Sequence, residues 1–488
     1  MKQIDVSRSD TRLVPDPSRV ITKPFLPGEQ IFPDGRSRVQ MILGRILGLT
    51  EAEVVATLAS TREQFDDRHP DLIEVFEKNF QLVATHVDQA QNLTTERRLL
   101  IGAYFTHEYS IEAAALNNPS IVPAPDQSGL ATGEQRFIMS LRAIGEGHLS
   151  SIEFRSGVID GQGLARLDDP APHPGTGSRT AAIYDKDFFS KRLMELGAWN
   201  EISKALIESL DDRFTIDEVE AAIHHFDRQG IDRSIAFETN RTLHWLASSN
   251  YTTSFDPDSD VSERIIFPAG PTESRGMEDA RFVRFTHDDG SVRYYATYTA
   301  FDGFQILPQL IETPDFLSFR IATLGGIRAT NKGMAIFPRM INGRYAALSR
   351  WDNQNNYVMF SEKVRFWDEA AQLQVPKQPW ELVQVGNCGS PLETEAGWLV
   401  ITHGVGPMRQ YSLGAILLDL DDPQRVIGHL PEPLLAPNED EREGYVPNVV
   451  YSCGSMIHAG RLVVPYGYSD EATSFASVAV DEVLARLS

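Results

Sequence analysis

The sequence has few cysteines, no excess of positive charge and no long apolar run, and each absence narrows the class of protein. Among 488 residues only Cys388 and Cys453 are cysteines. No disulfide framework is therefore expected, and a reducing cytoplasm is the simplest location. Lys and Arg number 45 against 68 Asp and Glu, a formal net charge of −23. That balance argues against a nucleic-acid partner, because such partners select a basic face.

Signals for membranes and cofactors are also lacking. No apolar stretch approaches the roughly 20 residues that cross a bilayer, and residues 1–6 lack the apolar core of a signal peptide. The sequence contains no HExxH, Walker A, GxSxG or paired CxxC motif. We therefore expect no membrane location, no metal site and no organic cofactor.

The hydrophobic pattern divides the chain into a helical beginning and a β-rich remainder. Residues 1–40 carry Pro and Arg without periodicity, which indicates an extended arm. Between about 36 and 105 apolar residues recur at helical spacing, which predicts three or four helices. We thus predict an N-terminal arm and helical region over 1–115 and a β domain over 116–488. The helices could pack on the domain, join a homo-oligomer or cover a site.

A second helical segment interrupts the β domain at about 187–229. Apolar residues return at helical spacing there, and Thr215-Ile216-Asp217-Glu218 is a plausible helix start. From residue 231 onward the pattern predicts strands almost throughout.

One type of short apolar strand, preceded by a glycine turn, recurs along the β domain. The copies occupy residues 293–298, 344–349, 398–403 and 461–466, with an earlier one at 136–141. Their spacing of about 50 to 60 residues is close to the roughly 40 to 50 of a four-stranded propeller blade. The sequence therefore predicts a mainly β fold, a five-bladed β-propeller, with a β-sandwich as the alternative. Equivalent propeller strands line a central channel, so these residues would converge there: Arg142, Tyr298, Arg350, His403 and Tyr466.

Two adjacent carboxylates, Glu278 and Asp279, stand at the start of one strand between Arg275 and Arg281. A carboxyl group near arginines suits general-acid chemistry on a sugar or a phosphate ester. Glu278 could instead only orient an arginine, and Asp279 could be a turn residue.

Three basic residues, Lys332, Arg350 and His403, would lie near the same channel. Arginine clamps a phosphate bidentately, and lysine supplies a compact charge. The alternatives are surface charges for Lys332 and Arg350, and a structural histidine for His403.

The motif at residues 275–281, R-G-M-E-D-A-R, resembles the G-x-E-D-P-R signature of glycoside hydrolase family 130, the β-mannoside phosphorylases and β-mannosidases. Further segments similar to the family's motifs follow in order at 332–338, 342–350, 397–405 and 444–454. The resemblance covers roughly residues 118–470 apart from the helical insertion. It implies a five-bladed propeller.

The resemblance also implies roles for individual residues. Asp279 matches the family's general acid, which in the phosphorylases protonates the glycosidic oxygen through a substrate hydroxyl. Lys332, Arg350 and His403 match the phosphate pocket. The predicted sugar-binding residues are Asn118, Arg142, Glu278, Tyr298, Tyr466 and Asp470. Of these, Asn118, Arg142 and Asp470 look similar to the residues that hold the mannosyl unit in the family.

Three positions depart from the family pattern. Ala280 replaces a usual proline, and Ser349 replaces a histidine that commonly precedes the arginine. Gln384 stands where phosphorylases often carry a phosphate-binding lysine, which puts phosphate as the nucleophile in doubt.

Phosphorolysis needs one acid and cations that position phosphate. Inverting hydrolysis also needs a second carboxylate as base, about 6.5 to 9.5 Å from the acid. We expect inverting phosphorolysis of β-mannosides, β-1,2-linked by resemblance, with inorganic phosphate as co-substrate and α-mannose 1-phosphate as product. The alternatives are an inverting β-mannosidase and a non-catalytic carbohydrate-binding propeller. The candidate bases for hydrolysis are Glu153, Glu238, Glu273 and Glu393.

Overall fold

The computed structural model describes residues 4–28, 30–32, 35–226, 233–304 and 306–487. The chain forms two compact units, which we describe separately. The larger unit contains Met1–Pro15, Ala114–Pro170 and Thr176–Ser488, and the smaller contains Asp16–Ala113 and Ala171–Gly175.

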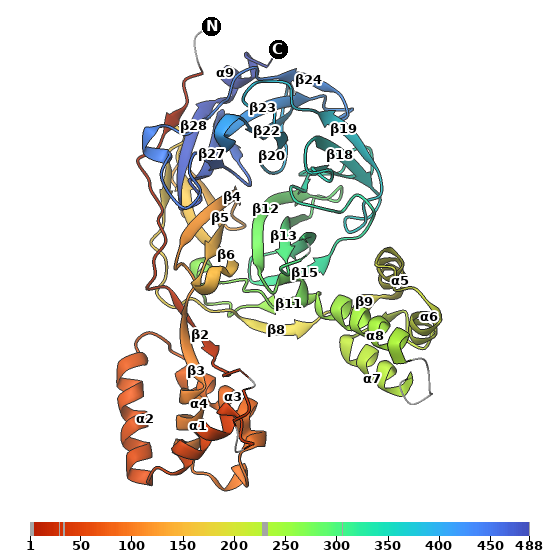
Figure 1. Cartoon of the computed structure of the whole chain (residues 1–488). Coiled ribbons are helices and arrows are strands. Elements are labelled where there is room, and N and C mark those ends of the chain that lie inside the picture. The colour runs from red at the N-terminus through yellow and green to blue at the C-terminus, as the bar shows by residue number, and fades with distance from the viewer. Residues whose placement is uncertain (1–3, 29, 33–34, 227–232, 305, 488) are drawn as a thin grey trace. The chain divides into compact units, whose positions relative to one another are not determined.

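The smaller unit is a group of helices with a two-stranded sheet (Figure 1). Its helices and strands are α1 (Arg38–Leu47), α2 (Glu51–Phe65), α3 (Leu72–Val83), α4 (Thr95–Tyr104), β2 (Val20–Pro24) and β3 (Thr106–Ser110). Capping boxes start α1 at Ser37 and α2 at Thr50, and each satisfies backbone N–H groups that a helix start leaves unpaired. The buried faces of all four helices share one apolar core, which includes Leu43, Leu58 and Phe76.

The larger unit is mainly β. Its ten-stranded sheet, counted over the described residues, consists of β4 (Ala115–Pro123), β5 (Gln135–Ile144), β6 (Ser150–Ile159), β7 (Ala165–Leu167), β8 (Ser178–Ala181), β11 (Tyr251–Ser254), β12 (Gly276–Thr286), β13 (Val292–Phe301), β14 (Ile306–Thr313) and β15 (Ser318–Thr323). A second sheet consists of β16 (Ala335–Ile336), β17 (Tyr345–Ser349), β18 (Asn356–Ser361) and β19 (Ala370–Gln374).

Two further large sheets belong to this unit, in addition to the two-stranded sheet of β9 (Tyr184–Asp185) and β10 (Arg213–Phe214) in the helical insertion. One consists of β20 (Gln384–Asn387), β21 (Leu392–Thr394), β22 (Gly397–Val405), β23 (Tyr411–Leu418) and β24 (Val426–His429). The other consists of β1 (Ser7–Arg8), β25 (Val450–Tyr451), β26 (Met456–His458), β27 (Arg461–Tyr468) and β28 (Ala472–Ala479), and α9 (Val480–Leu484) follows. The predicted N-terminal region of 1–115 is wrong at its start. Strand β1 pairs with β28, so the first residues of the chain belong to the larger unit.

The five recurring strands predicted from the sequence correspond to β5, β13, β17, β22 and β27. Each pairs with antiparallel neighbours on both sides. Figure 1 shows their sheets arranged around a common centre.

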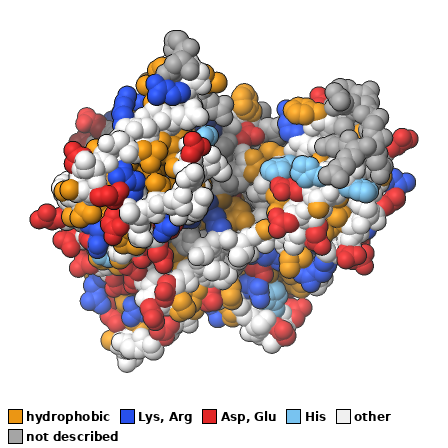
Figure 2. Space-filling view, turned by 90° about the horizontal axis from the view of Figure 1, so that it is seen from below, with side chains coloured by type: hydrophobic (Ala, Val, Ile, Leu, Met, Phe, Trp, Pro, Cys, Tyr) orange, Lys and Arg blue, Asp and Glu red, His pale blue; other side chains and the backbone are white. Residues whose placement is uncertain are grey.

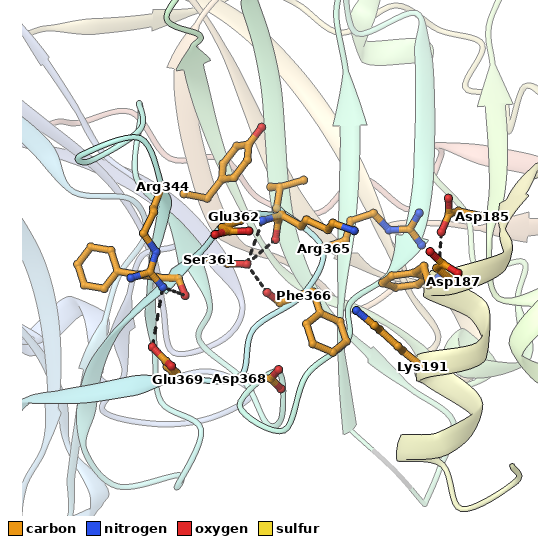
Figure 3. Close-up of a pocket in the computed structure, with 15 residues that line it drawn as sticks. Asp185, Asp187, Lys191, Arg344, Ser361, Glu362, Arg365, Phe366, Asp368 and Glu369 are labelled. Atoms are coloured by element: carbon orange, nitrogen blue, oxygen red, sulfur yellow. Dashed lines mark hydrogen bonds and ion pairs between the residues drawn. The ribbon is translucent and has the colours of Figure 1, made fainter.

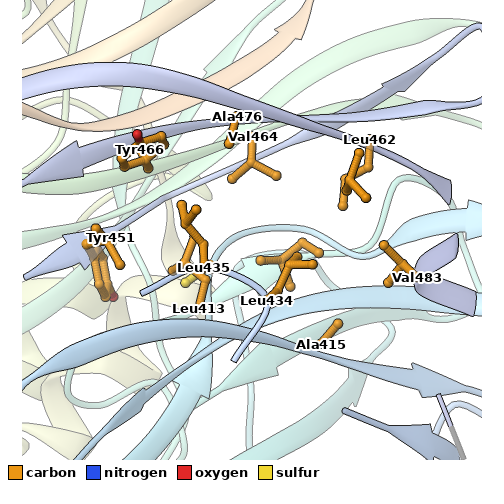
Figure 4. Close-up of a cluster of buried hydrophobic side chains, with 14 of the residues drawn as sticks. Leu413, Ala415, Leu434, Leu435, Tyr451, Leu462, Val464, Tyr466, Ala476 and Val483 are labelled. Carbon is orange, nitrogen blue, oxygen red and sulfur yellow. The ribbon is translucent and has the colours of Figure 1, made fainter. Parts of the chain in front are cut away.

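Adjacent sheets enclose the apolar core. Figure 4 shows one such cluster, in which Leu413 and Ala415 of β23 face Leu462 and Val464 of β27. Full burial of each such leucine or valine is worth about 1.5 to 3 kcal/mol.

The helical insertion is longer than the sequence pattern predicted. It contains β9 (Tyr184–Asp185), α5 (Lys186–Glu195), α6 (Glu201–Glu208), β10 (Arg213–Phe214), α7 (Ile216–Phe226) and α8 (Arg233–Ser248). The predicted end at residue 229 and the strand start at 231 lie outside the described residues. The expectation of strands immediately beyond is wrong, because α8 packs Leu243, Leu246 and Ala247 into the core of the insertion.

On the face that Figure 2 shows, Lys and Arg side chains lie among more numerous Asp and Glu side chains. Over the described residues, every helix is too short or too polar to cross a bilayer.

Candidate active site

Strand ends and loops from the four large sheets of the larger unit meet at a polar pocket of about 150 Å³. Its lining residues are Asn118, Arg142, Glu278, Asp279, Lys332, Arg350, Gln384, His403, Arg409, Tyr411, Val446, Val449, Tyr451 and Asp470. The structure therefore brings together eight of the ten site residues predicted from the sequence.

Asp279 enters this pocket from a β-bulge. Strand β12 pairs Glu278 with Thr299 and Arg281 with Thr297, so two residues of β12 oppose one of β13 between these pairs. Asp279 has a φ of 56°, a left-handed conformation that costs free energy for a residue other than glycine. Bulges change the direction of side chains next to active sites. Because of this bulge, the Asp279 side chain does not follow the alternating up-and-down pattern of the strand.

Opposing influences set the charge of Asp279. Burial raises the pKa of its carboxyl group, but the positive charges of Arg281, Lys332, Arg142 and Arg350 together hold that pKa below the ordinary aspartate value. Arg281 is the first of these charges: its Nη2 lies 3.6 Å from Asp279 Oδ2, and its Nη1 donates to the Asp279 carbonyl at 2.9 Å. Asp279 is therefore ionised at neutral pH.

Glu278 holds two of the cations in place. Its two carboxylate oxygens accept hydrogen bonds from Arg142 Nη2 and Lys332 Nζ, each at 2.6 Å. Arg142 also donates from Nε to Ser150 Oγ at 2.9 Å. Glu278 is thus a positioning carboxylate for both side chains.

Lys332 lies in a short loop that is fixed from both sides. Asn331 and Gly333, its neighbours, have φ values of 61° and 90°. The Asn331 side chain donates to the Trp351 carbonyl, and Asn387 Nδ2 donates to the Gly333 carbonyl at 2.6 Å. These bonds give the lysine a defined approach to the pocket.

Arg350 offers hydrogen-bond donors that nothing around it satisfies. The residue is only 7% exposed, and its Nε and Nη1 have no hydrogen-bond partner among the described residues. Leaving a buried charged donor unpaired costs about 1 to 3 kcal/mol or more. Such a guanidinium is suited to bind an anion.

His403 lies beside Arg350 as a neutral imidazole. Burial lowers its pKa well below the ordinary histidine value, and the charges of Arg350 and Arg281 lower it further. Its Nδ1 lies 3.7 Å from Cys388 Sγ, and its Nε2 has no partner among the described residues. Gly386 makes room for this pair, because a Cβ there would lie 2.6 Å from His403 Cε1 and 3.2 Å from Arg350 Cδ.

Asp470 and Asn118 line the same pocket in left-handed conformations, with φ values of 50° and 49°. Burial raises the pKa of Asp470; Arg142 opposes this increase and Asp279 adds to it. Asn118 Oδ1 has no partner among the described residues. Both side chains can therefore take hydroxyl groups as hydrogen-bond partners.

The structure does not bring Tyr298 and Tyr466 to the pocket, which corrects the predicted convergence of these strand ends. Tyr298 donates its hydroxyl to Glu273, and Tyr466 donates to Glu441 Oε1 at 2.6 Å. Both rings are buried in apolar clusters. Successive side chains of a strand point to opposite faces of the sheet. A residue near the end of a strand can therefore point away from the channel.

Several lining residues were not predicted, among them Arg409, Tyr411 and Tyr451. Arg409 and Tyr411 follow the glycine-rich turn after His403 closely, which was the available signal. Tyr451 accepts a hydrogen bond from Arg281 Nη2 at 2.8 Å and so fixes the arginine beside Asp279.

A larger cavity of about 740 Å³ lies near α5, away from these residues (Figure 3). Two of its cations already have neighbours: Lys191 Nζ lies 5.3 Å from the centre of the Phe366 ring, and Arg344 Nη2 lies 3.8 Å from Glu369 Oε2. None of the site residues predicted from the sequence lines it.

A buried carboxylate, a neutral imidazole and unsatisfied guanidinium donors surround one small pocket, and these groups are suited to hydrogen-bond a hydroxylated molecule and an anion. The model of one glycoside hydrolase family, described as β-1,4-mannooligosaccharide phosphorylase, matches residues 254–488. The chain belongs to this family, glycoside hydrolase family 130, which confirms the resemblance seen in the sequence motifs.

Two characterised relatives each match somewhat less than half of this chain. The 1,2-β-oligomannan phosphorylase of a Thermoanaerobacter species is 34% identical over 218 residues, which is 43% of this chain and 71% of the relative. The β-1,2-mannobiose phosphorylase of Listeria innocua is 31% identical over 231 residues, 46% of this chain and 63% of that one. A solved structure of the Listeria innocua β-1,2-mannobiose phosphorylase, with β-1,2-mannobiose, aligns with a TM-score of 0.45 at 20% identity over 78% of this chain and 93% of that chain.

Proposed function

We propose that this protein catalyses the inverting phosphorolysis of β-mannosides and releases α-mannose 1-phosphate, with Asp279 as the general acid. The observation that carries the proposal is Arg350, whose buried and unsatisfied donors lie in the same pocket as Asp279. The names of the two relatives support β-1,2-linked oligomannosides as the substrate. Inorganic phosphate is the co-substrate.

In the reaction, a phosphate oxygen attacks C1 of the mannosyl unit and the bond from C1 to the glycosidic oxygen breaks. Asp279 supplies the proton for the departing oxygen through a substrate hydroxyl. Arg350, Lys332 and His403 hold the phosphate. Its negative charge offsets the cations that lower the pKa of Asp279, so phosphate binding favours the protonated acid that the step requires.

The mannosyl unit is held by Asn118, Arg142 and Asp470 in this proposal. Glu278 acts indirectly, since its hydrogen bonds fix Arg142 and Lys332. A sugar bound among polar side chains that are already oriented loses less entropy on reaching the reactive geometry.

Hydrolysis is the second candidate, and it requires a carboxylate base. The four glutamates proposed as bases lie outside the pocket lining. Glu153 is ion-paired with Arg155, Glu273 accepts from Tyr298, and Glu393 is bound by Arg339. Glu238 is exposed on α8. Asp470 and Glu278 are the carboxylates that share the pocket with Asp279. A non-catalytic sugar-binding role gives no reason to place an acid among these cations.

The five-bladed propeller belongs to the proposal as well. It is supported by the five recurring strands, each of which pairs with a neighbouring strand on both sides. Their sheets are arranged around a common centre (Figure 1). A cytoplasmic location, the lack of nucleic-acid and membrane partners, and a homo-oligomer through the N-terminal helices stay predictions.

The decisive experiment is turnover of β-1,2-mannobiose with and without inorganic phosphate, with separate detection of mannose 1-phosphate and free mannose. We expect mannose 1-phosphate only when phosphate is present. Arg350→Ala should raise the KM for phosphate about 10- to 100-fold, from the roughly 1.5 to 3 kcal/mol of a hydrogen bond to a charged group. The KM for mannobiose should change much less.

Arg425→Ala is the matched control, because Arg425 is an exposed arginine paired with Asp419 and lies outside the pocket lining. Equal turnover in phosphate-free buffer would show that the protein is a hydrolase. An unchanged KM for phosphate in Arg350→Ala would remove Arg350 from the anion site.

A further inference from the structure

Gln384 lies at the pocket in the place where the family resemblance puts a phosphate-binding lysine, so the pocket lacks one expected cation. Two of the cations present are already engaged, since Arg142 and Lys332 share the carboxylate of Glu278 at 2.6 Å each. A phosphate dianion held by Arg350 and by Lys332, whose charge is already partly offset by Glu278, would be incompletely neutralised. The structure supplies another cation from a different loop.

Arg409 lines the pocket from the turn between β22 and β23. Among the described residues it forms no hydrogen bond and no ion pair. Met408 and Arg409 are consecutive non-glycine residues with φ values of 58° and 57°. Strain of this kind persists where the surrounding structure enforces it, often at ligand-binding sites.

Aromatic stacking links Arg409 to the anion site. Its guanidinium carbon lies 5.9 Å from the centre of the Tyr411 ring. The Tyr411 ring in turn stacks against His403, with centroids 6.1 Å apart and planes 14° from parallel. Arginine is well suited to stack on an aromatic ring while its N–H donors remain available.

The strand register places Arg409 at the same end of the sheet as Gln384. Val405 of β22 pairs with Gln384 on one side and with Tyr411 on the other. These three residues form one row across adjacent strands, and Arg409 lies in the turn just beyond it. A side chain from this turn can therefore reach the region that a lysine at position 384 would serve.

We propose that Arg409 binds the attacking phosphate together with Arg350 and so replaces the lysine that Gln384 lacks. This inference rests on the proposed phosphorolysis. Two of the N–H donors of the Arg409 guanidinium can clamp two phosphate oxygens, while Gln384 contributes a neutral amide. The phosphate specificity of this chain thus depends on a residue outside the recognised motifs.

The test compares Arg409→Ala with Arg409→Ala/Gln384→Lys in steady-state phosphorolysis of β-1,2-mannobiose. Arg409→Ala should raise the KM for phosphate at least about tenfold, the effect of losing one charge-assisted hydrogen bond, and leave the KM for mannobiose unchanged. The added lysine should restore most of the lost phosphate affinity. Met408→Ala is the matched control, since Met408 is 91% exposed in the same turn and its loss should change neither constant.

Two kinetic outcomes would overturn the inference. One is an unchanged KM for phosphate in Arg409→Ala. The other is an increase in the KM for mannobiose that Gln384→Lys does not reverse, which would assign Arg409 to the sugar. Calorimetric titration of inorganic phosphate into wild type and Arg409→Ala separates this inference from the proposed reaction. Weaker phosphate binding in the variant would support the role of Arg409 even if the wild type released only free mannose. Equal binding would reject that role whatever the product.

Discussion

Gly386→Ala is the sharpest test of the pocket, because it adds one methyl group at the point where two functional side chains meet. Gly386 pairs with His403 across β20 and β22. Its φ lies outside the left-handed region, so alanine fits the backbone. The effect of the substitution is therefore steric.

The size of the effect follows from the contacts that the new Cβ would make. It would lie 2.6 Å from His403 Cε1 and 3.2 Å from Arg350 Cδ, whereas carbon atoms prefer about 3.5 to 4.0 Å. The imidazole must therefore move by about 0.9 Å. A displacement near 1 Å in a reactive geometry can cost about 100-fold in rate, and overpacking costs about 1 to 3 kcal/mol of folding stability.

The assay measures kcat and the KM for phosphate and for mannobiose, with urea unfolding as the check on folding. We expect kcat/KM for phosphate to fall about 100-fold while the protein remains folded. Gly161→Ala is the control, because its Cβ would meet only the Gly133 carbonyl oxygen at 3.7 Å. A folded Gly386→Ala variant with normal phosphate kinetics would show that His403 and Arg350 do not form the anion site.

Three further predictions concern Asp279. Asp279→Asn should lower kcat by about 100- to 10,000-fold, the usual contribution of a general acid, with mannobiose binding still measurable by calorimetry; near-normal turnover would exclude it as the acid. Lys332→Met removes a cation that lowers the pKa of Asp279, so that pKa should rise and the basic limb of the pH profile of kcat/KM should move to higher pH; an unmoved limb would contradict this coupling. Arg281→Met leaves Asp279 and Tyr451 without a buried partner and should cost about 3 to 5 kcal/mol in urea unfolding. Because the folded-state pKa of Asp279 is depressed, its charge stabilises the fold at neutral pH and this contribution disappears as pH falls through that pKa. The cost of Arg281→Met should therefore shrink in acid and in the Asp279→Asn background; an equal cost in that background would show that the two side chains do not interact.

The recurring strands could be predicted from the sequence because each is a short apolar run after a glycine turn, a signal that depends on local residues. The long helix α8 was missed for the opposite reason. Its apolar face is formed by a few residues, such as Leu243 and Leu246, between polar and aromatic ones, and the surrounding β pattern dominated the interpretation.

The candidate site was predictable where motifs carry chemistry and unpredictable where backbone geometry decides. Asp279 could be named from its neighbours, yet the bulge that directs it into the pocket leaves no mark in the strand pattern. The direction of a side chain was equally hard to predict for Tyr298 and Tyr466. Both lie in the predicted strands, but their side chains point away from the pocket. Ala280 lies in this bulge and has no ladder partner there, so a residue without a backbone N–H, such as proline, would also fit this position.

The pairing of β1 with β28 has a consequence for how the chain folds. Ser474 Oγ donates to the Ser9 carbonyl, a contact between residues 465 positions apart, and Arg8 Nε donates to Glu441 Oε1 at 3.1 Å. Closing so long a loop costs roughly 5 kcal/mol of chain entropy. During synthesis β1 must wait until β28 has emerged before the two strands can pair. From then until β1 docks, β28 presents an open edge to other chains.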